Sequence, residues 1–380
     1  MSKNNIFCHA PWTNIEILPN GDILPCCKFQ NSSYNEKFNI QNNTVKEFRQ
    51  SDFLREIKRE FEQNVWPSGC ARCRIEEEIG TKSKRLLDFE RWEDSYKKYN
   101  FLDDNILTIS LAIGNTCNLK CIMCSPHASS LWKTEYENIY KISIDNINSI
   151  RKDAIHDLIN FAPNLVHIDF HGGEPFLSNV EYQLKIFDYY IQQGRAKDIS
   201  IHYTTNGTIF PDDRFWERFS FFKHVDIQLS IDGIRKRYEY IRFPAKWDTL
   251  EQHVLKFLNT QKNMPNLQLS VAHTLTAFNV YYLEEFYKWC SEIGLPDPWV
   301  GRLHRPDHLR ATVWPRQVRQ IIIDKLKLAE IFNFCSWIDL LSEFDDSIKF
   351  EDFKKFVSTH DNYRKTHFSH TFPELAPFIL

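Results

Sequence analysis

The sequence predicts an α/β protein built on an open, incomplete barrel of six strand–helix units, a partial (β/α)6 barrel of the TIM type. Three observations predict it: β-rich runs alternate with helical stretches from residue 105 onwards, polar or glycine-rich residues follow successive runs, and most cysteines gather in the first third of the chain. Repeated strand–helix alternation implies a parallel sheet with right-handed crossovers. A doubly wound sheet is the competing architecture, and either one places chemistry at the carboxyl ends of the strands.

The length and composition indicate a folded protein with a large core. The chain has 380 residues, of which 42% are hydrophobic and 14% aromatic, and this composition excludes disorder, collagen-like repeats and coiled coil. The formal net charge of −3 gives no basic footprint over the whole surface, so a nucleic-acid partner is not expected. The sequence contains no apolar run of membrane-spanning length and no apolar stretch near its start, so we expect no membrane partner and a cytoplasmic protein.

The irregular N-terminal segment forms the first predicted domain, residues 1–100. Its β-rich runs at 15–18 and 22–24 flank Pro19-Asn20-Gly21, a turn sequence that predicts a β-hairpin. Apolar residues at mainly helical spacing predict a helix over residues 45–63.

The second predicted domain is the partial barrel, residues 101–303, and a helical C-terminal extension, residues 304–380, forms the third. The extension carries no motif that indicates a role. Strands of the barrel are predicted at 106–113, 165–170, 199–203, 225–231, 267–273 and 298–303. Helices between them are predicted at 127–140, 151–161, 180–193, 212–221, 249–261 and 281–292.

Cys117, Cys121 and Cys124 follow the first barrel strand with the spacing C-x3-C-x2-C. In a cytosolic protein, closely spaced thiols indicate metal or redox chemistry rather than disulfides. Three thiolates can converge on one soft metal centre, and a cubane [4Fe–4S] cluster held by three cysteines keeps one iron without a protein ligand. A structural zinc site prefers four ligands, so we expect a cluster here rather than zinc.

A second set of thiols lies in the N-terminal segment. Cys26 follows a glycine of the predicted hairpin by five residues, and Cys70 and Cys73 form a C-x2-C pair that Cys8 completes to four thiols. Four thiolates suit zinc and a [4Fe–4S] cluster almost equally, so these residues by themselves leave the metal open. Cys27 adjoins Cys26, and either of the two can be the ligand.

The three-cysteine motif after the first strand resembles that of the radical S-adenosylmethionine (SAM) superfamily, and the resemblance covers residues 106–303. It implies that Cys117, Cys121 and Cys124 hold a [4Fe–4S] cluster whose open iron takes the amino and carboxylate groups of SAM. An electron from the reduced cluster then cleaves SAM into methionine and a 5′-deoxyadenosyl radical. Met123 matches the position at which relatives place a large apolar residue against the adenine.

Further motifs at strand ends match SAM-contacting positions of that superfamily. Gly172-Gly173-Glu174-Pro175, after the second strand, resembles the stretch assigned to the SAM amino group. Glycines let a backbone approach a ligand, and a carboxylate beside an ammonium group forms a charge-assisted hydrogen bond. Ser230 and Asp232, at the end of the fourth strand, resemble the ribose-contacting position, with a simple strand-ending turn as the alternative. Thr205 and Asn206 are similarly placed after the third strand.

The N-terminal thiols resemble the auxiliary-cluster module of SPASM and twitch radical SAM enzymes, which carries the same G-x4-C and C-x2-C elements. The resemblance implies that Cys8, Cys26, Cys70 and Cys73 hold an auxiliary [4Fe–4S] cluster closed by four ligands, suited to electron transfer or structural work. Better-known relatives carry this module after the barrel, whereas it comes first in this chain.

The resemblance implies a radical SAM enzyme that abstracts hydrogen from a substrate, with a peptide or protein side chain expected. A small metabolite, a sugar derivative or a nucleoside is the alternative substrate. An electron donor such as flavodoxin or ferredoxin is implied as a partner, and the sequence indicates no catalytic side chain. A different class of function is a non-catalytic zinc or iron–sulfur scaffold, in which the thiols only hold the fold together.

Overall fold

The computed structural model describes residues 6–30, 34, 36–78, 80–100, 105–145, 154–329 and 331–379. The chain divides into two compact units. Unit 1 comprises residues 1–116, 146–204 and 211–226, and unit 2 comprises residues 117–145, 205–210 and 227–380.

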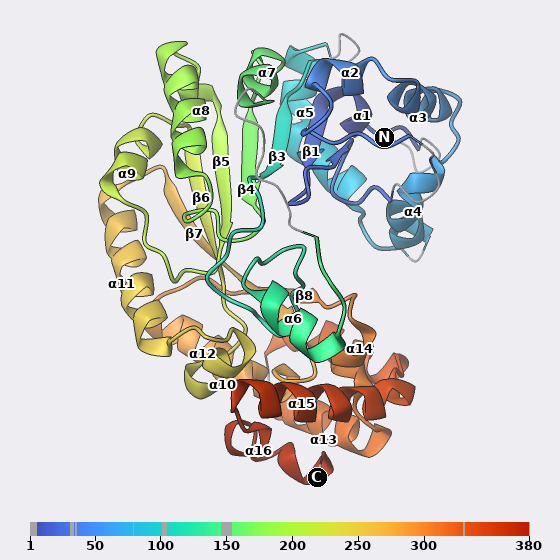
Figure 1. Ribbon diagram of the computed structural model, residues 1–380, viewed down its shortest axis with the longest axis vertical. Helices are drawn as coiled ribbons and strands as arrows, with labels where there is room; N and C mark the ends of the chain where they lie inside the picture. The colour runs from blue at the N-terminus through green and yellow to red at the C-terminus, as the bar shows by residue number, and fades with distance from the viewer. Residues whose placement is uncertain are drawn as a thin grey trace. The chain divides into compact units, whose positions relative to one another are not determined.

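Eight strands form one sheet in the order β2-β1-β3-β4-β5-β6-β7-β8 (Figure 1). They are β1 Asn14–Ile17, β2 Ile23–Leu24, β3 Thr108–Ala112, β4 His167–His171, β5 Ser200–Thr205, β6 His224–Ser230, β7 Leu267–Leu275 and β8 Trp299–Arg302. The pairs β1–β3, β3–β4, β4–β5 and β7–β8 are parallel, and β1–β2 is antiparallel. From β3 to β8 the neighbours follow chain order, without the reversal that marks a doubly wound sheet. The predicted α/β class is confirmed.

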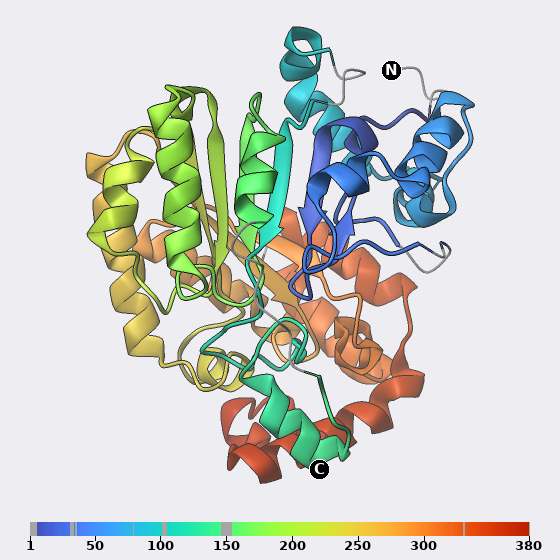
Figure 2. The same cartoon turned by 45° about the horizontal axis from the view of Figure 1, so that its top comes forward.

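Helices connect the strands, and more helices follow β8 (Figure 2). None of the described helices is both long enough and apolar enough to cross a membrane. In unit 1 the helices are α1 Ala10–Thr13, α2 Val45–Arg49, α3 Asp52–Glu62, α4 Ala71–Glu78, α5 Lys84–Lys98, α7 Ala154–Asn160, α8 Val180–Gln192 and α9 Asp213–Phe219. In unit 2 they are α6 Trp132–Tyr140, α10 Arg235–Ile241, α11 Trp247–Asn263, α12 Leu283–Ile293, α13 Arg316–Leu328, α14 Cys335–Glu343, α15 Phe350–Arg364 and α16 Phe368–Thr371.

Each of the six predicted barrel strands overlaps an observed strand, and each predicted barrel helix overlaps an observed helix, whereas α10 was not predicted. The first three residues of the helix predicted at 151–161 lie outside the described residues. The helix predicted at 127–140 begins only at Trp132, because turns occupy the preceding residues.

The single helix predicted over residues 45–63 is wrong: two helices, α2 and α3, occupy this stretch. The Ser51 side chain accepts a hydrogen bond from the Leu54 N–H and so caps the start of α3. Thr44 and Glu47 form a capping box at the start of α2. A serine hydroxyl that satisfies a free N–H favours a helix start over helix continuation.

The predicted N-terminal hairpin is present as β1 and β2, with Gly21 at φ +86° in its turn. Its strand β1 also extends the sheet, because Ile15 pairs in parallel register with Ile109 of β3. The side chains of Ile15 and Ile17 are almost completely buried, so this docking covers apolar surface. The sequence did not predict this strand pairing.

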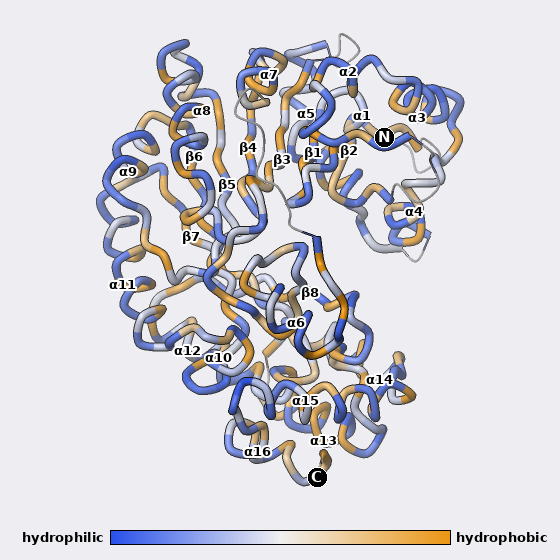
Figure 3. Tube along the Cα trace, in the orientation of Figure 1, coloured by the Kyte–Doolittle hydropathy of each residue, from blue (hydrophilic) through white to orange (hydrophobic). Residues whose placement is uncertain are grey.

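Apolar residues are concentrated on the strands and on the helix faces that cover them (Figure 3). In unit 1 the buried ring of Tyr203 stacks on Phe170 and Phe176, with centroids 4.8 and 4.5 Å apart. In unit 2 the rings of Phe278 and Phe353 meet at 5.2 Å, so the segment after β7 and the C-terminal helices share an aromatic core. The predicted helical C-terminal extension is confirmed.

Candidate functional site

The cysteine loop, residues 117–124, lies in unit 2 and is fixed by backbone hydrogen bonds to one neighbouring segment. The Lys120 N–H donates to the Phe243 carbonyl at 2.7 Å, and the Ile122 N–H donates to the Ile241 carbonyl at 2.8 Å. These bonds pair alternate residues of the loop with the last residue of α10 and the segment after it. The three cysteine side chains therefore project from a backbone that is held on both sides of Cys121.

Several N–H groups approach the sulfur atoms of this loop. The Leu119 N–H donates to Cys117 Sγ at 3.4 Å, and Asn206 Nδ2 lies 3.9 Å from the same sulfur. Arg242 Nη1 lies 3.9 Å from Cys121 Sγ. Donors of this kind stabilise negative charge on a thiolate ligand.

Burial governs the protonation of the thiols in this loop. It raises the pKa of Cys121 to about 12 and that of Cys124 to about 11. Arg242 lowers the pKa of Cys121, whereas Asp232 raises it. Without a bound metal these thiols stay protonated at neutral pH, so the thiolates form when a metal replaces the protons.

The side chain of Arg242 is held by a buried carboxylate. Its Nη2 lies 2.6 Å from Asp232 Oδ2, and Asp232 is completely buried. The other carboxylate oxygen, Oδ1, accepts from the Thr274 N–H at 2.6 Å, and the Asp232 carbonyl accepts from Asn279 Nδ2 at 3.1 Å. Asp232, predicted at the ribose-contacting position, thus also fixes the cation that faces Cys121.

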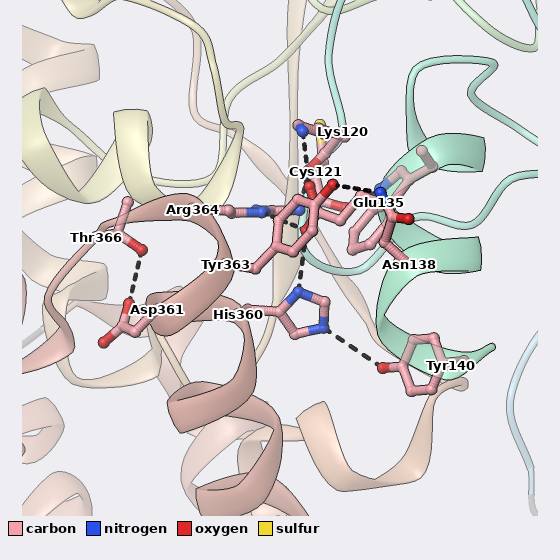
Figure 4. Close-up of polar contacts among 11 residues, drawn as sticks. Lys120, Cys121, Glu135, Asn138, Tyr140, His360, Asp361, Tyr363, Arg364 and Thr366 are labelled. Carbon is pink, nitrogen blue, oxygen red and sulfur yellow. Dashed lines mark hydrogen bonds and ion pairs between the residues drawn. The ribbon is translucent and has the colours of Figure 1, made fainter.

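A second buried carboxylate, Glu135 of α6, joins the cysteine loop to the C-terminal helix α15 (Figure 4). Lys120 Nζ lies 2.7 Å from it, Arg364 Nε donates to it at 2.7 Å, and His360 Nδ1 lies 3.0 Å away. Arg364 Nη2 also donates to the Lys120 carbonyl at 2.8 Å, while Trp132 Nε1 donates to the Cys121 carbonyl. Two permanent cations on one carboxylate leave a surplus of buried positive charge beside the loop.

The Gly-Gly-Glu-Pro motif lies in unit 1, where it packs on the residues just before the cysteine loop. Gly172 and Gly173 have φ of +76° and +53°, and a Cβ on Gly173 would lie 2.3 Å from the Thr116 carbonyl oxygen. The Glu174 N–H donates to that carbonyl at 2.8 Å. The Glu174 side chain is fully buried, with Oε1 accepting from the Phe176 N–H at 3.1 Å. Only glycine fits this approach of two backbones.

The remaining predicted cofactor-binding residues have varied surroundings. Thr205 is buried and its hydroxyl accepts from the Gly207 N–H at 3.1 Å, which closes a turn. Asn206 lies at the cysteine loop, since its amide donates to Asn118 Oδ1 at 3.0 Å. Half-buried side chains are found at Met123 and Ser230, and Pro175 is buried.

The four predicted N-terminal thiols lie together in unit 1. Burial raises the pKa of Cys26, and the neighbouring thiols of Cys27, Cys8 and Cys70 raise it further. Burial also raises the pKa of Cys8 to about 12, with a further contribution from Cys73. Thiols that act on one another in this way are neighbours in unit 1.

Cys27 has a different environment from Cys26. Cys27 is exposed as a residue. Partial burial of its sulfur raises its pKa most, and the charged groups that act most on this pKa are Lys84, Glu16 and Asp88. Other thiols are among the groups that act on the pKa of Cys26 but not among those that act most on the pKa of Cys27, so Cys26 stays the predicted ligand of the two.

The donor sets fit an iron–sulfur cluster by their chemistry. Three thiols on one short loop, and four thiols in one small module, are the soft ligands that iron–sulfur clusters use. Within the described ranges, no three cysteine, histidine or carboxylate side chains are drawn together as tightly as a single bound ion needs. The buried cations around Cys121 complement the negative charge that a thiolate-bound cluster carries.

One face of the sheet in unit 1 carries histidine–carboxylate pairs. Glu16 of β1 lies 3.0 Å from His171 at the end of β4, and Asp226 lies 2.7 Å from His202. Asp169 is the strand partner of His202. Burial lowers the pKa of both imidazoles, but the carboxylate partners outweigh it and raise the pKa overall. Both histidines therefore hold a proton more readily than a free imidazole does.

Sequence reasoning missed Arg242, Glu135, His360 and Arg364. Their partners are far away along the chain, and Glu135 is separated from His360 by 225 positions. No spacing rule or motif links such residues, so no signal in a single sequence identifies them.

Two family models match the chain. Residues 8–74 match the model of the SPASM domain, an iron-sulfur cluster-binding domain, and residues 109–242 match the model of a 4Fe-4S single cluster domain. The two matches confirm the predicted resemblance to radical SAM enzymes with a SPASM module, here placed before the core. They also confirm [4Fe–4S] clusters as the expected prosthetic groups.

A curated relative is the uncharacterized protein MJ0907 of Methanocaldococcus jannaschii. It is 30% identical over 200 residues, which are 50% of this chain and 61% of the relative. The chain thus matches about three fifths of that protein's length.

Solved structures with some similarity include three whose descriptions name a ligand. One is anSMEcpe with bound AdoMet and the Kp18Cys peptide, at 17% identity and a TM-score of 0.43, covering 58% of this chain and 60% of that one. A second is SuiB of Streptococcus suis bound to S-adenosylmethionine, at 14% identity and a TM-score of 0.39, covering 75% and 60%. A third is TYW1 with a lysine-pyruvate adduct bound, at 11% identity and a TM-score of 0.33, covering 72% of this chain and 88% of that one. Similarity at this level carries no argument about substrate.

Proposed function

We propose that the protein is a radical SAM enzyme that cleaves SAM reductively and abstracts hydrogen from a peptide or protein side chain. The observation that carries the proposal is the cysteine loop, where three half-buried cysteines follow β3 on a backbone fixed by hydrogen bonds. A three-thiol set keeps one iron of a cubane free for a ligand other than the protein. When bound, the cluster supplies the electron that splits SAM into methionine and a 5′-deoxyadenosyl radical.

The residues of this chain have distinct roles in the proposal. Cys117, Cys121 and Cys124 would hold the cluster, and the motif from Gly172 to Pro175 would orient SAM.

The auxiliary cluster is assigned to Cys8, Cys26, Cys70 and Cys73. Their mutual effect on pKa supports this grouping, and a cluster closed by four ligands suits electron transfer rather than substrate binding. The peptide substrate class rests on the resemblance to peptide-modifying radical SAM maturases.

Anaerobic reconstitution with iron and sulfide tests the proposal. We expect about eight irons per chain and broad absorbance near roughly 400 nm, as for two cubane clusters. Addition of dithionite and SAM should then yield 5′-deoxyadenosine, measured by chromatography. The Cys117→Ala variant is the matched control, and it should yield none.

Two results contradict the proposal. Stoichiometric zinc in the purified protein, with no deoxyadenosine after reconstitution, would establish the scaffold function instead. Deoxyadenosine that forms equally well in the Cys117→Ala variant would show that the loop does not hold the reactive cluster.

A further inference from the structure

Arg242 places a guanidinium group against a sulfur of the cysteine loop. Its Nη1 lies 3.9 Å from Cys121 Sγ, and its side chain is 10% exposed. Neither the family motifs nor the sequence spacing assigns it a role. A cation so near a cluster ligand and so poorly solvated has a strong electrostatic effect on that ligand.

The backbone holds Arg242 in place at this sulfur. Its two neighbours, Ile241 and Phe243, accept the hydrogen bonds from Ile122 and Lys120 that fix the cysteine loop. Arg242 therefore lies between two backbone bonds to the loop and cannot move independently of Cys121.

The side chain is held just as firmly at its far end. Asp232 Oδ2 lies 2.6 Å from Arg242 Nη2, and the carboxylate is itself fixed by the Thr274 N–H. The Nε of Arg242 has no hydrogen-bond partner among the described residues. Of the three donor groups of this guanidinium, one thus faces a carboxylate and one faces the sulfur.

The charges of the two residues act on the sulfur in opposite directions. A one-electron reduction adds a negative charge to a cluster, so a nearby cation favours the reduced form and a nearby carboxylate disfavours it. Hydrogen bonds to sulfur and local charge are known determinants of cluster potential. Asp232 is fully buried, so solvent does not screen its charge.

We propose that Arg242 is a positioning residue that raises the reduction potential of the cluster on the cysteine loop, and that Asp232 limits this effect. The proposal rests on the proposed function, because it concerns the cluster of that same loop. It goes beyond that function by naming the charge pair that decides how easily the cluster accepts its electron.

The test is a redox titration of the reconstituted protein without SAM. Dithionite supplies the electron, and the reduced cluster is followed by electron paramagnetic resonance. Arg242→Gln should shift the midpoint of the loop cluster to more negative potential, because the cation is lost. Arg242→Lys keeps the charge and should stay near the wild type. Asp232→Asn should shift the midpoint to more positive potential, since Arg242 then lacks its counter-charge while the amide oxygen can still accept from Thr274.

Two controls are needed: one removes the signal of the auxiliary cluster, and the other tests whether any lost cation of the unit shifts the midpoint. The titrations are made in a Cys26→Ser and Cys70→Ser background, which leaves only the loop cluster. Lys288 is a cation in the same unit whose side chain is 64% exposed, and Lys288→Gln should leave the midpoint unchanged.

Opposite shifts in the two variants support the proposal, because general damage to the site gives no reason for opposite signs. Midpoints that are unchanged, or that move in the same direction, overturn it. If Arg242→Gln does not fold, the sign of the shift in Asp232→Asn decides. A wild-type protein that cleaves SAM while the variants show no shift overturns only the role of Arg242, whereas a wild-type protein that takes up no iron overturns the proposed function as well.

Discussion

Glycine at position 173 is required by geometry that no other residue meets. Its φ of +53° is in the left-handed region, and a Cβ there would lie 2.3 Å from the Thr116 carbonyl oxygen. Backbone atoms cannot yield to such a contact without moving β4 or the residues before the cysteine loop. The close approach thus couples the predicted SAM-binding motif to the segment that leads into Cys117.

Gly173→Ala should therefore lower the free energy of unfolding by more than the cost of a left-handed alanine, which is about 1–2 kcal/mol. Gly194 is the matched control, since its φ is +66° but a Cβ there would meet nothing within 4 Å. Gly194→Ala should show only the conformational cost. Urea unfolding of both variants without metal measures the difference, and equal losses would contradict the steric argument.

Glu135 is a single buried charge on which the cysteine loop and α15 both depend. Glu135→Gln keeps its shape but leaves Lys120 and Arg364 without a counter-charge. Removing one partner of a buried ion pair costs about 3–5 kcal/mol. We therefore expect the free energy of unfolding, measured with urea, to fall by an amount in that range. The exposed pair of Glu351 and Lys354 provides the control, because Glu351→Gln should change stability by less than about 1 kcal/mol.

The contribution of Glu135 also depends on pH in a defined direction. Burial raises its pKa, but the hydrogen bond from His360 and the charge of Arg364 outweigh burial and lower the pKa from 4.5 to about 2. A lowered folded-state pKa gives stability that is present above the unfolded pKa and lost as the pH falls towards the folded one. The stability difference between wild type and Glu135→Gln should therefore shrink between pH 4.5 and about 2. A difference that stays constant over this range would show that Glu135 acts through packing alone.

At the scale of elements, α15 contacts both the aromatic core and the cysteine loop, which the sequence of the C-terminal extension does not reveal. One face of the helix carries Phe353 into the aromatic core with Phe278 and Trp314. Its last turns carry His360 and Arg364 to Glu135. The helix therefore connects the extension to the cysteine loop as well as to the segment that follows β7.

Phe353→Ala should destabilise unit 2 by about 3–5 kcal/mol, because it removes a completely buried ring. Ile348 lies just before α15 and is 89% exposed, so Ile348→Ala should change stability by no more than about 0.5 kcal/mol. Thermal unfolding of the reconstituted protein compares the two variants. Loss of the loop cluster from Phe353→Ala, but not from Ile348→Ala, would be expected if α15 supports the loop.

At the scale of the whole molecule, the chain carries two separate thiol sets, one in each unit. Cys70→Ser and Cys121→Ser should each lower the iron content from about eight to about four per chain, because each variant removes a ligand from a different cluster. Cys27→Ser should leave the iron content unchanged, since Cys27 is exposed beside Cys26. Iron analysis after anaerobic reconstitution measures all three, and a loss of iron in Cys27→Ser would exchange the roles of the two adjacent cysteines.

Much of the fold could be predicted from local pattern. Strand runs and helical periodicity follow the burial of each segment, and glycines mark turns, so β3 to β8 and most helices between them were identified at nearly the right residues. The short helix α10 was missed. The division at Ser51 was missed, because apolar periodicity continues across a cap and only the hydroxyl contact shows the break. The docking of β1 on β3 was also missed, since strand pairing depends on which edges meet in three dimensions.

The sequence by itself determined the chemistry of this protein: the spacing of three thiols after a strand, the glycine-rich turn after the next strand, and the N-terminal cysteine pattern. These are short-range features, fixed by covalent spacing along a few residues. Only the tertiary structure decided that Arg242 faces Cys121 and that Glu135 gathers Lys120, His360 and Arg364. Such contacts join residues far apart in the chain, and burial away from water makes their charges strong, which no local pattern records.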